Sequence, residues 1–150
     1  MTKPVEIIEK NLTKIIESTI KIKVAGRRDR IPTPLLKTIE KIEGATKDHL
    51  GMTLMLCIDY GAYDELITAI KKSDSPTIEA INQHLMIKEP VDLLIRPGGE
   101  LRLSNFLLWQ AAYAELYFIK KFWPSFSKKD LYKACLSYSK RNRRFGGIKE

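Results

Sequence analysis

The sequence is poor in the residue types that build metal and disulfide sites. Its 150 residues include two cysteines, Cys57 and Cys135, and two histidines, and none of them has the spacing of a metal site or the setting of a disulfide framework. No apolar run approaches the roughly 20 residues that a membrane-spanning helix needs, and the amino terminus shows no signal-peptide pattern. Internal repeats are also absent. We therefore expect a cytoplasmic protein with reduced cysteines.

Acidic side chains are outnumbered by basic ones, which leaves a formal net charge of +8. Part of the excess lies in two clusters, one at 27–30 and one at 140–144. Such a charge favours polyanions, acidic membrane surfaces or anionic substrates. A basic nucleic-acid-binding domain is one alternative. However, no nucleic-acid module is recognisable and no aromatic residues alternate with the first cluster, so we do not expect a nucleic-acid partner.

Hydrophobic periodicity predicts alternating helices and strands. Strand-like runs occupy Lys21–Ala25 and residues 52–58, 91–95 and 116–119, and helical patterns occupy residues 5–16, 35–42, 66–70, 78–85, 105–112 and 131–138. The nearly continuous apolar run at 52–58 is typical of a strand buried on both faces. Ser127 with Asp130 resembles a capping box for the last helix. We predict the α/β class, with a mostly parallel sheet flanked by helices in a single layered domain.

The segment 91–110 carries the clearest chemical signal. A predicted strand ends at Arg96, the chain turns through Pro97-Gly98-Gly99, and a helical pattern begins behind Arg102 and Ser104. Ligands of α/β proteins lie outside the carboxyl ends of the strands, and helix N-termini attract anions. Arginine matches phosphate oxygens with its planar fork. We therefore predict a phosphate or diphosphate site, in which Glu100 orients an arginine; an ordinary turn with solvated arginines is the alternative.

Longer motifs in the chain resemble a known family. The segment I-R-P-G-G-E-L-R-L-S-N-F-L-L-W-Q-A-A-Y-A-E-L-Y-F, then F-W-P-S-F and the terminal R-N-R-R-F-G-G, resemble the signature of the cis-prenyltransferases, typified by undecaprenyl diphosphate synthase. Upstream, C-I-D-Y-G-A-Y-D-E is similar to that family's N-Y-G-G-R-x-E segment. The resemblance extends over essentially the whole chain.

The resemblance implies a magnesium-dependent synthase that condenses isopentenyl diphosphate with an allylic diphosphate. The residues that match the family's isopentenyl diphosphate site are Arg96, Arg102 and Ser104, and Glu115 matches its magnesium site. Arg144, Phe145 and Gly146 match the terminal Arg-x-Gly motif, which in family members reaches the partner's diphosphate site across a dimer interface. A homodimer or heterodimer is therefore expected, with association to a membrane surface through the lipid product.

The chain also departs from the family's pattern. The Asp-Gly-Asn-Gly-Arg-Trp loop, whose aspartate binds magnesium, does not occur in these residues, so we assign no catalytic residue. Pro97 and Tyr63 stand where the family commonly has threonine and arginine. We expect residues 1–150 to form the carboxyl-terminal portion of such a domain, with an incomplete sheet that exposes strand edges and needs a partner.

These observations lead to one functional expectation and, beside the nucleic-acid-binding domain named above, one further alternative. We expect cis-prenyl chain elongation to a polyprenyl diphosphate, active only when a segment or subunit supplies the aspartate loop. The same chain is compatible with a non-catalytic accessory subunit that donates Arg144 and Gly146 to a complete catalytic chain. The retained Arg96, Arg102 and Ser104 argue against that role.

Overall fold

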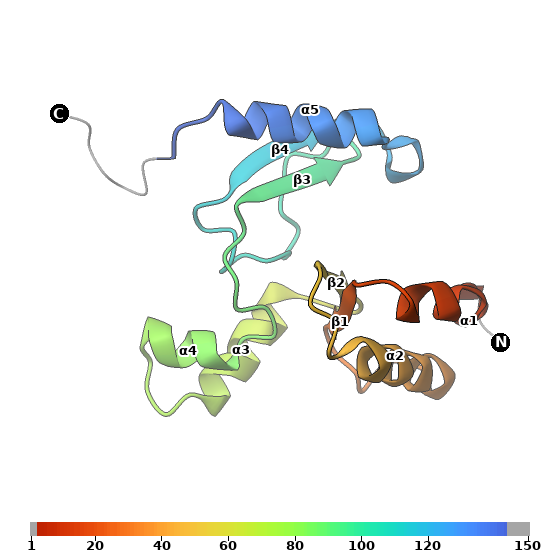
Figure 1. Ribbon diagram of the computed structural model, residues 1–150. Coiled ribbons are helices and arrows are strands. Elements are labelled where there is room, and N and C mark those ends of the chain that lie inside the picture. Colours follow the sequence, from red (N-terminus) through yellow and green to blue (C-terminus); the bar gives the residue numbers. More distant parts are fainter. Residues whose placement is uncertain (1–2, 144–150) are drawn as a thin grey trace. The chain divides into compact units, whose positions relative to one another are not determined.

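The computed structural model describes residues 3–143 (Figure 1). Its elements, in chain order, are α1 (Lys3–Ile16), β1 (Lys21–Ala25), α2 (Thr33–Thr46), β2 (Thr53–Cys57), α3 (Ala62–Lys72), α4 (Ile78–His84), β3 (Leu93–Pro97), β4 (Glu115–Ile119), a 3-10 turn η1 (Trp123–Ser125) and α5 (Lys128–Ser139). The chain divides into two compact units with their boundary between Thr68 and Ala69, inside α3.

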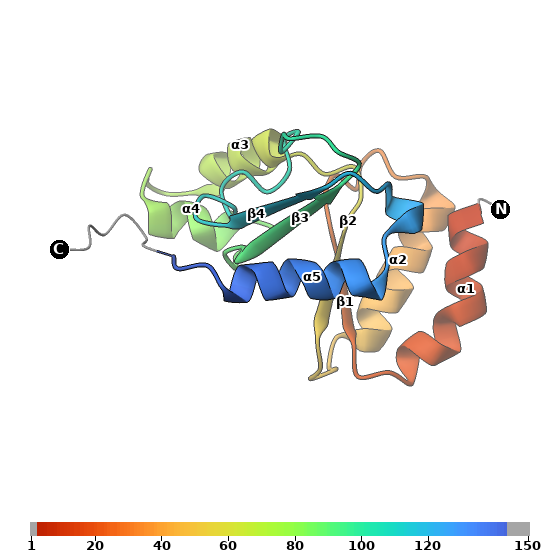
Figure 2. The same cartoon turned by 90° about the horizontal axis from the view of Figure 1, so that it is seen from above.

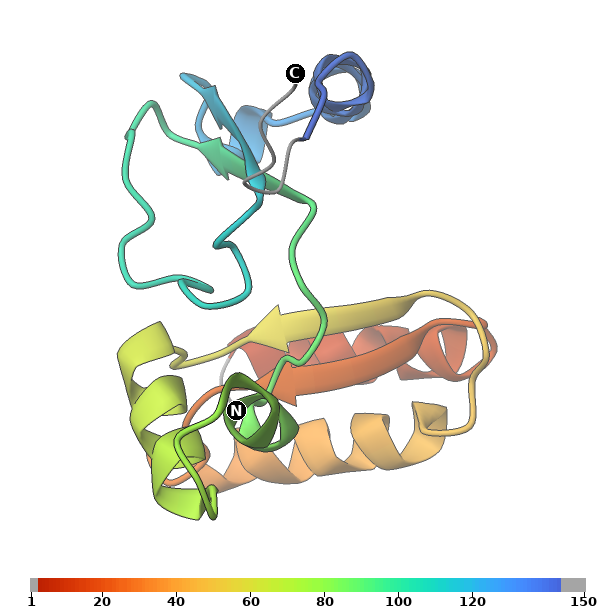
Figure 3. The ribbon, with the colours of Figure 1, turned by 90° about the vertical axis from the view of Figure 1, so that its left-hand side faces the viewer.

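The first unit is built on two parallel strands. β1 pairs with β2 in the register Lys21 to Thr53 through Ala25 to Cys57. α2 packs along β1, as Figure 3 shows, and α1 packs on α2. α2 begins with Pro34 in its first turn, where a missing backbone N–H costs nothing. It buries Ile39 and Ile42, which are 3% and 5% exposed.

Side chains of α2 close the outer edge of β1. The backbone N–H of Ile22 donates to Oγ1 of Thr46 at 3.1 Å, and the N–H of Val24 donates to Oε1 of Glu43 at 2.8 Å. Thr46 is fully buried, and its hydroxyl also donates to the carbonyl of Ile42 at 2.9 Å. Edge donors that normally pair with another strand are therefore satisfied by a helix.

β2 differs from the prediction of a strand buried on both faces. Leu54 and Leu56 remain 41% and 39% exposed, although they line an apolar cavity of about 240 Å³ together with residues of α1, α2 and β1. Among the described residues β2 pairs only with β1. The expectation of an exposed apolar face is thus confirmed, and the prediction of complete burial is wrong because α1 and α2 leave this cavity beside the leucines instead of packing closely on them.

The second unit holds another parallel pair. β3 pairs with β4 from Leu93 opposite Glu115 to Pro97 opposite Ile119. α5 runs beside these strands in the opposite direction (Figure 2). The predicted capping box is confirmed, since one carboxylate oxygen of Asp130 accepts from the N–H and the hydroxyl of Ser127 at 2.9 and 2.6 Å.

The helix predicted at 105–112 is wrong. The structure has consecutive turns there, and Ser104, Asn105 and Leu107 adopt positive φ angles of 51°, 61° and 48°. These left-handed conformations interrupt helical hydrogen bonding. The apolar spacing that suggested a helix arises instead from a folded loop between β3 and β4.

The α/β class with parallel strands and flanking helices is confirmed. The strands form two pairs rather than the single sheet that was expected. Both cysteines are free: Cys135 is exposed, while Cys57 is half-buried and burial raises the pKa of its thiol. Within residues 3–143 no helix combines the length and apolar character that crossing a bilayer requires.

Candidate diphosphate site

Arg96 lies at the carboxyl end of β3 and holds the following loop. Its Nη1 atom donates to the hydroxyl oxygen of Ser104 at 3.0 Å and also to the backbone carbonyl of Arg102. The structure therefore gathers the three predicted residues at one end of the β3–β4 pair. Arg96 and Ser104 meet through their side chains, whereas Arg102 meets Arg96 through its backbone.

The side chain of Arg102 has a different partner. Its Nη1 atom lies 2.6 Å from Oε2 of Glu100, and the two side chains are 64% and 50% exposed. The prediction that Glu100 orients an arginine is confirmed by this ion pair. Because the pair is exposed, an anion of higher charge can replace Glu100 at little cost.

The turn glycines contribute geometry rather than anion-binding donors. Gly98 and Gly99 have φ angles of 105° and 78°, which favour glycine. Their N–H groups donate to the carbonyls of Lys121 and Ile119 at 2.8 and 3.0 Å. These donors fasten the turn to the end of β4, and with no helix at 105–112 the expected helix N-terminus is also missing. An anion at this turn therefore does not meet the N–H groups of the two glycines.

A small cavity adjoins Arg96. It measures about 230 Å³, and its lining residues are Leu94, Ile95, Arg96, Pro97, Leu103, Ser104 and Phe106. Pockets for drug-sized ligands span about 300–1,000 Å³. The cavity is therefore smaller than a typical ligand pocket, and Arg96 and Ser104 form its polar wall among five apolar residues.

Glu115 does not form a magnesium site with the described residues. It begins β4, and its Oε2 atom accepts from Nη1 of Arg141 at 2.7 Å. Within residues 3–143 no three acidic, histidine or cysteine side chains gather as metal ligands would. A single carboxylate beside a guanidinium does not fit a divalent cation held by the described residues alone. Arg141 is a partner of Glu115 that sequence reasoning missed.

The terminal motif residues Arg144, Phe145 and Gly146 lie outside the described residues. Just before them, Arg143 pairs with Asp92 at 2.7 Å and lies 5.5 Å from the centre of the Tyr138 ring. Its hydrogen bond to Asp92 raises the pKa of the Arg143 guanidinium. Arg141 and Arg143 thus fasten the chain after α5 to the amino ends of the β3–β4 pair.

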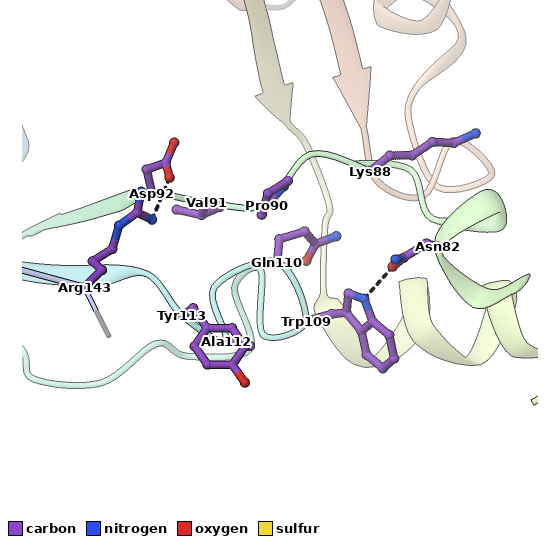
Figure 4. Close-up of a pocket in the computed structure, with 10 residues that line it drawn as sticks. All are labelled: Asn82, Lys88, Pro90, Val91, Asp92, Trp109, Gln110, Ala112, Tyr113 and Arg143. Atoms are coloured by element: carbon purple, nitrogen blue, oxygen red, sulfur yellow. Dashed lines mark hydrogen bonds and ion pairs between the residues drawn. The ribbon is translucent and has the colours of Figure 1, made fainter. Parts of the chain in front are cut away.

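A larger hollow of about 350 Å³ lies near Arg143 (Figure 4). Its lining includes Lys88, Asp92 and Trp109, and Nε1 of Trp109 donates to Oδ1 of Asn82 at 2.7 Å. Sequence reasoning did not find this hollow, because Asn82 and Lys88 lie 27 and 21 residues before Trp109 and no local pattern connects them.

The first basic cluster is neutralised inside its own unit. Arg27 pairs with Asp29 at 2.7 Å, Arg28 with Glu43 at 2.8 Å, and Arg30 with Asp59 at 2.5 Å. Hydrogen bonds to Asp29 and Asp59 raise the pKa values of Arg27 and Arg30. This pairing removes the free cationic stripe that a nucleic-acid interface needs.

The whole chain is similar in sequence to known proteins. Residues 1–146 match the family described as "Putative undecaprenyl diphosphate synthase". The isoprenyl transferase of Listeria monocytogenes is 41% identical, with 99% of this chain and 64% of the relative covered. That of Thermotoga maritima is 39% identical, with 96% and 66% covered. The chain therefore spans about two thirds of the length of these curated relatives.

Solved structures show the same fold. A probable undecaprenyl diphosphate synthase from Campylobacter jejuni superposes with a TM-score of 0.83 at 33% identity, over 94% of this chain and 72% of that one. Lavandulyl diphosphate synthase from Lavandula x intermedia, solved in complex with dimethylallyl diphosphate, gives 0.87 at 33% identity, over 95% and 67%.

Proposed function

Because the chain belongs to the undecaprenyl diphosphate synthase family, we propose that it takes part in cis-prenyl chain elongation. In this reaction isopentenyl diphosphate condenses with an allylic prenyl diphosphate to give a longer polyprenyl diphosphate. The observation that carries the proposal is the cluster of Arg96, Arg102 and Ser104 at the carboxyl end of β3. Dimethylallyl diphosphate, the ligand of the lavender structure, is an allylic diphosphate of the proposed substrate class.

In the proposed complex the diphosphate of isopentenyl diphosphate binds beside Arg96. The Arg96 guanidinium keeps its bond to the Ser104 oxygen, so the Ser104 hydroxyl hydrogen is available for a phosphate oxygen. Arg102 exchanges Glu100 for the diphosphate, which carries more charge. Fixing the diphosphate in this way orients the isopentenyl unit toward the second substrate and lowers the entropic cost of their meeting.

The proposal includes a requirement for further residues. The described residues lack a carboxylate cluster for magnesium, and the Asp-Gly-Asn-Gly-Arg-Trp loop does not occur in the sequence. We propose that a segment bearing this loop, on the same or another polypeptide, supplies the carboxylate that accompanies Glu115. A second subunit, identical or not, belongs to the same proposal, with Arg144 and Gly146 as its contacts.

Binding of isopentenyl diphosphate, measured by calorimetry, tests the site. We expect saturable binding that the double variant Arg96→Ala and Arg102→Ala abolishes. A matched control, Lys37→Gln with Lys41→Gln, removes the same charge from the exposed face of α2 and should leave binding unchanged. Unchanged affinity in the arginine variant would refute the assignment.

Condensation separates the catalytic proposal from the accessory alternative. Radiolabelled isopentenyl diphosphate is incubated with an allylic diphosphate and magnesium, with and without a polypeptide carrying the aspartate loop. If this chain elongates, product formation requires Arg96 of this chain. If it is an accessory subunit, the product level does not change when Arg96→Ala replaces the native chain.

A further inference from the structure

The outer face of α5 carries an unusual combination of side chains. Lys128, Lys129, Tyr132, Lys133 and Leu136 line one shallow groove, and we call them the α5 outer face. Their spacing of three and four residues places them on one side of the helix. The opposite side is buried through Asp130 and Ala134, which are 4% and 0% exposed. Packing within the second unit therefore leaves the α5 outer face available.

The charge of this region has one sign. Residues 120–140 include six lysines and one acidic residue, Asp130. That carboxylate is buried and accepts from Lys121 Nζ at 2.9 Å, as well as from Ser127. The exposed charges on and beside α5 are consequently all positive.

Large apolar side chains accompany these lysines. Tyr132 and Leu136 are 68% and 42% exposed, and Phe122 and Trp123, just before α5, are 71% and 73% exposed. The Trp123 ring stacks on Phe126 with centroids 5.7 Å apart. A contiguous exposed patch of large apolar side chains usually marks an interaction surface.

We propose that the α5 outer face, with Phe122 and Trp123 beside it, docks the protein on an anionic lipid bilayer. Lysines beside exposed aromatic and aliphatic residues are the composition of helices that lie in the membrane interface, where the charges attract acidic lipids and the apolar groups enter the head-group region. Charge complementarity selects this occupant over a neutral apolar partner. The inference depends on the composition of this surface alone and not on the proposed prenyl transfer.

Sedimentation with vesicles tests the proposal. The full chain is mixed with vesicles of phosphatidylcholine alone or of phosphatidylcholine with phosphatidylglycerol. We expect binding to the anionic vesicles, and weakening by salt. The triple variant Lys128→Gln, Lys129→Gln, Lys133→Gln should bind roughly a hundredfold more weakly, since each lysine near an acidic membrane is worth about fivefold. Two of these lysines lie in the first turn of α5, where loss of positive charge does not destabilise a helix.

Matched controls distinguish docking from general charge attraction. The variant Lys37→Gln, Lys41→Gln, Lys47→Gln removes the same charge from the α2 region and should bind like the native chain. Tyr132→Gln with Leu136→Gln should weaken binding several-fold at constant charge, while Leu50→Gln with Ile67→Gln, which alters residues 99% and 52% exposed, should not.

Tryptophan fluorescence supplies a readout of position. When anionic vesicles are added, the fluorescence emission of Trp123 should shift to shorter wavelength and should be quenched by brominated acyl chains. The Trp123→Phe variant should lose that response. The proposal is overturned if the native chain ignores anionic vesicles, if both lysine triples bind equally, or if single-stranded nucleic acid competes the chain off the vesicles through the same lysines.

Discussion

Arg96 Nη1 lies 3.0 Å from Ser104 Oγ, so a side chain at the end of β3 holds the loop eight residues further along the chain. Ser104 has a positive φ angle, and the bond to Arg96 stabilises this conformation. The same guanidinium also donates to the carbonyl of Arg102. Arg96 therefore both shapes the loop and provides the charge that a diphosphate would meet.

Replacing Arg96 with lysine should weaken isopentenyl diphosphate binding by about tenfold to a hundredfold. Lysine keeps the charge but lacks the fork that reaches Ser104, Arg102 and a phosphate at once. A hydrogen bond to a charged group contributes about 1.5–3 kcal/mol. Calorimetry measures the affinity, and Lys37→Arg on α2 serves as a control for the exchange. Native affinity in Arg96→Lys would show that charge alone suffices.

Glu100→Gln should strengthen the binding of inorganic pyrophosphate. Arg102 then no longer has to leave a carboxylate 2.6 Å away before it meets the ligand. Because exposed pairs contribute about 0.2–1 kcal/mol, the gain should be at most about fivefold. The affinity can be measured by competition with isopentenyl diphosphate. The gain should vanish in the double variant with Arg102→Ala; weaker binding in Glu100→Gln would instead mean that Glu100 positions Arg102 for the ligand.

Two glycines of the first unit should respond to alanine in opposite directions. Gly26 has a φ angle of 128°, and a Cβ atom there would lie 2.0 Å from the carbonyl oxygen of Ile58. Gly26→Ala should lower the free energy of unfolding by about 1–3 kcal/mol from backbone strain alone. Gly44 lies inside α2 with open space around it, so Gly44→Ala should raise that free energy by roughly 0.5–1 kcal/mol. Urea unfolding measures both.

Stability should fall at acidic pH through Asp130. Hydrogen bonds from Ser127, and then from Lys121, hold the pKa of this carboxyl well below its usual range. The folded state therefore binds fewer protons than the unfolded state in acid, and the free energy of unfolding decreases as the pH falls below about 4. Urea unfolding between pH 6 and pH 2 should show this decrease, and Asp130→Asn should be less stable at neutral pH with a smaller decrease in acid. Parallel curves for the two proteins would rule out Asp130 as the cause.

The sequence predicted the strands well and the loop after β3 badly. β1 was expected at Lys21–Ala25 and is found there, and the capping box of Ser127 and Asp130 is also confirmed. These features depend on neighbouring residues, which periodicity can detect. The apolar residues of 105–112 have the spacing of a helix, but Ser104 and Asn105 adopt positive φ angles, which are incompatible with a helix that begins there.

Contacts between residues far apart in the chain are the part of the site that the sequence could not predict. The clustering of Arg96, Arg102 and Ser104 follows from their nearness in sequence, and it was predicted. The pairing of Glu115 with Arg141 joins residues 26 apart, and that of Arg28 with Glu43 joins residues 15 apart. No local pattern indicates which of many exposed charges will meet across such separations. The magnesium and dimer expectations, which come from the family resemblance, stay predictions.

The hydrogen bonds from β1 to Thr46 and Glu43 have a consequence for misfolding. A newly arriving peptide cannot extend this sheet beyond β1 without first displacing two side chains, one of them fully buried. Fibril-like growth of the first unit should therefore proceed at one edge of its sheet only, that of β2. A mutation that exposes the backbone N–H groups of Ile22 and Val24 would allow growth at the β1 edge as well.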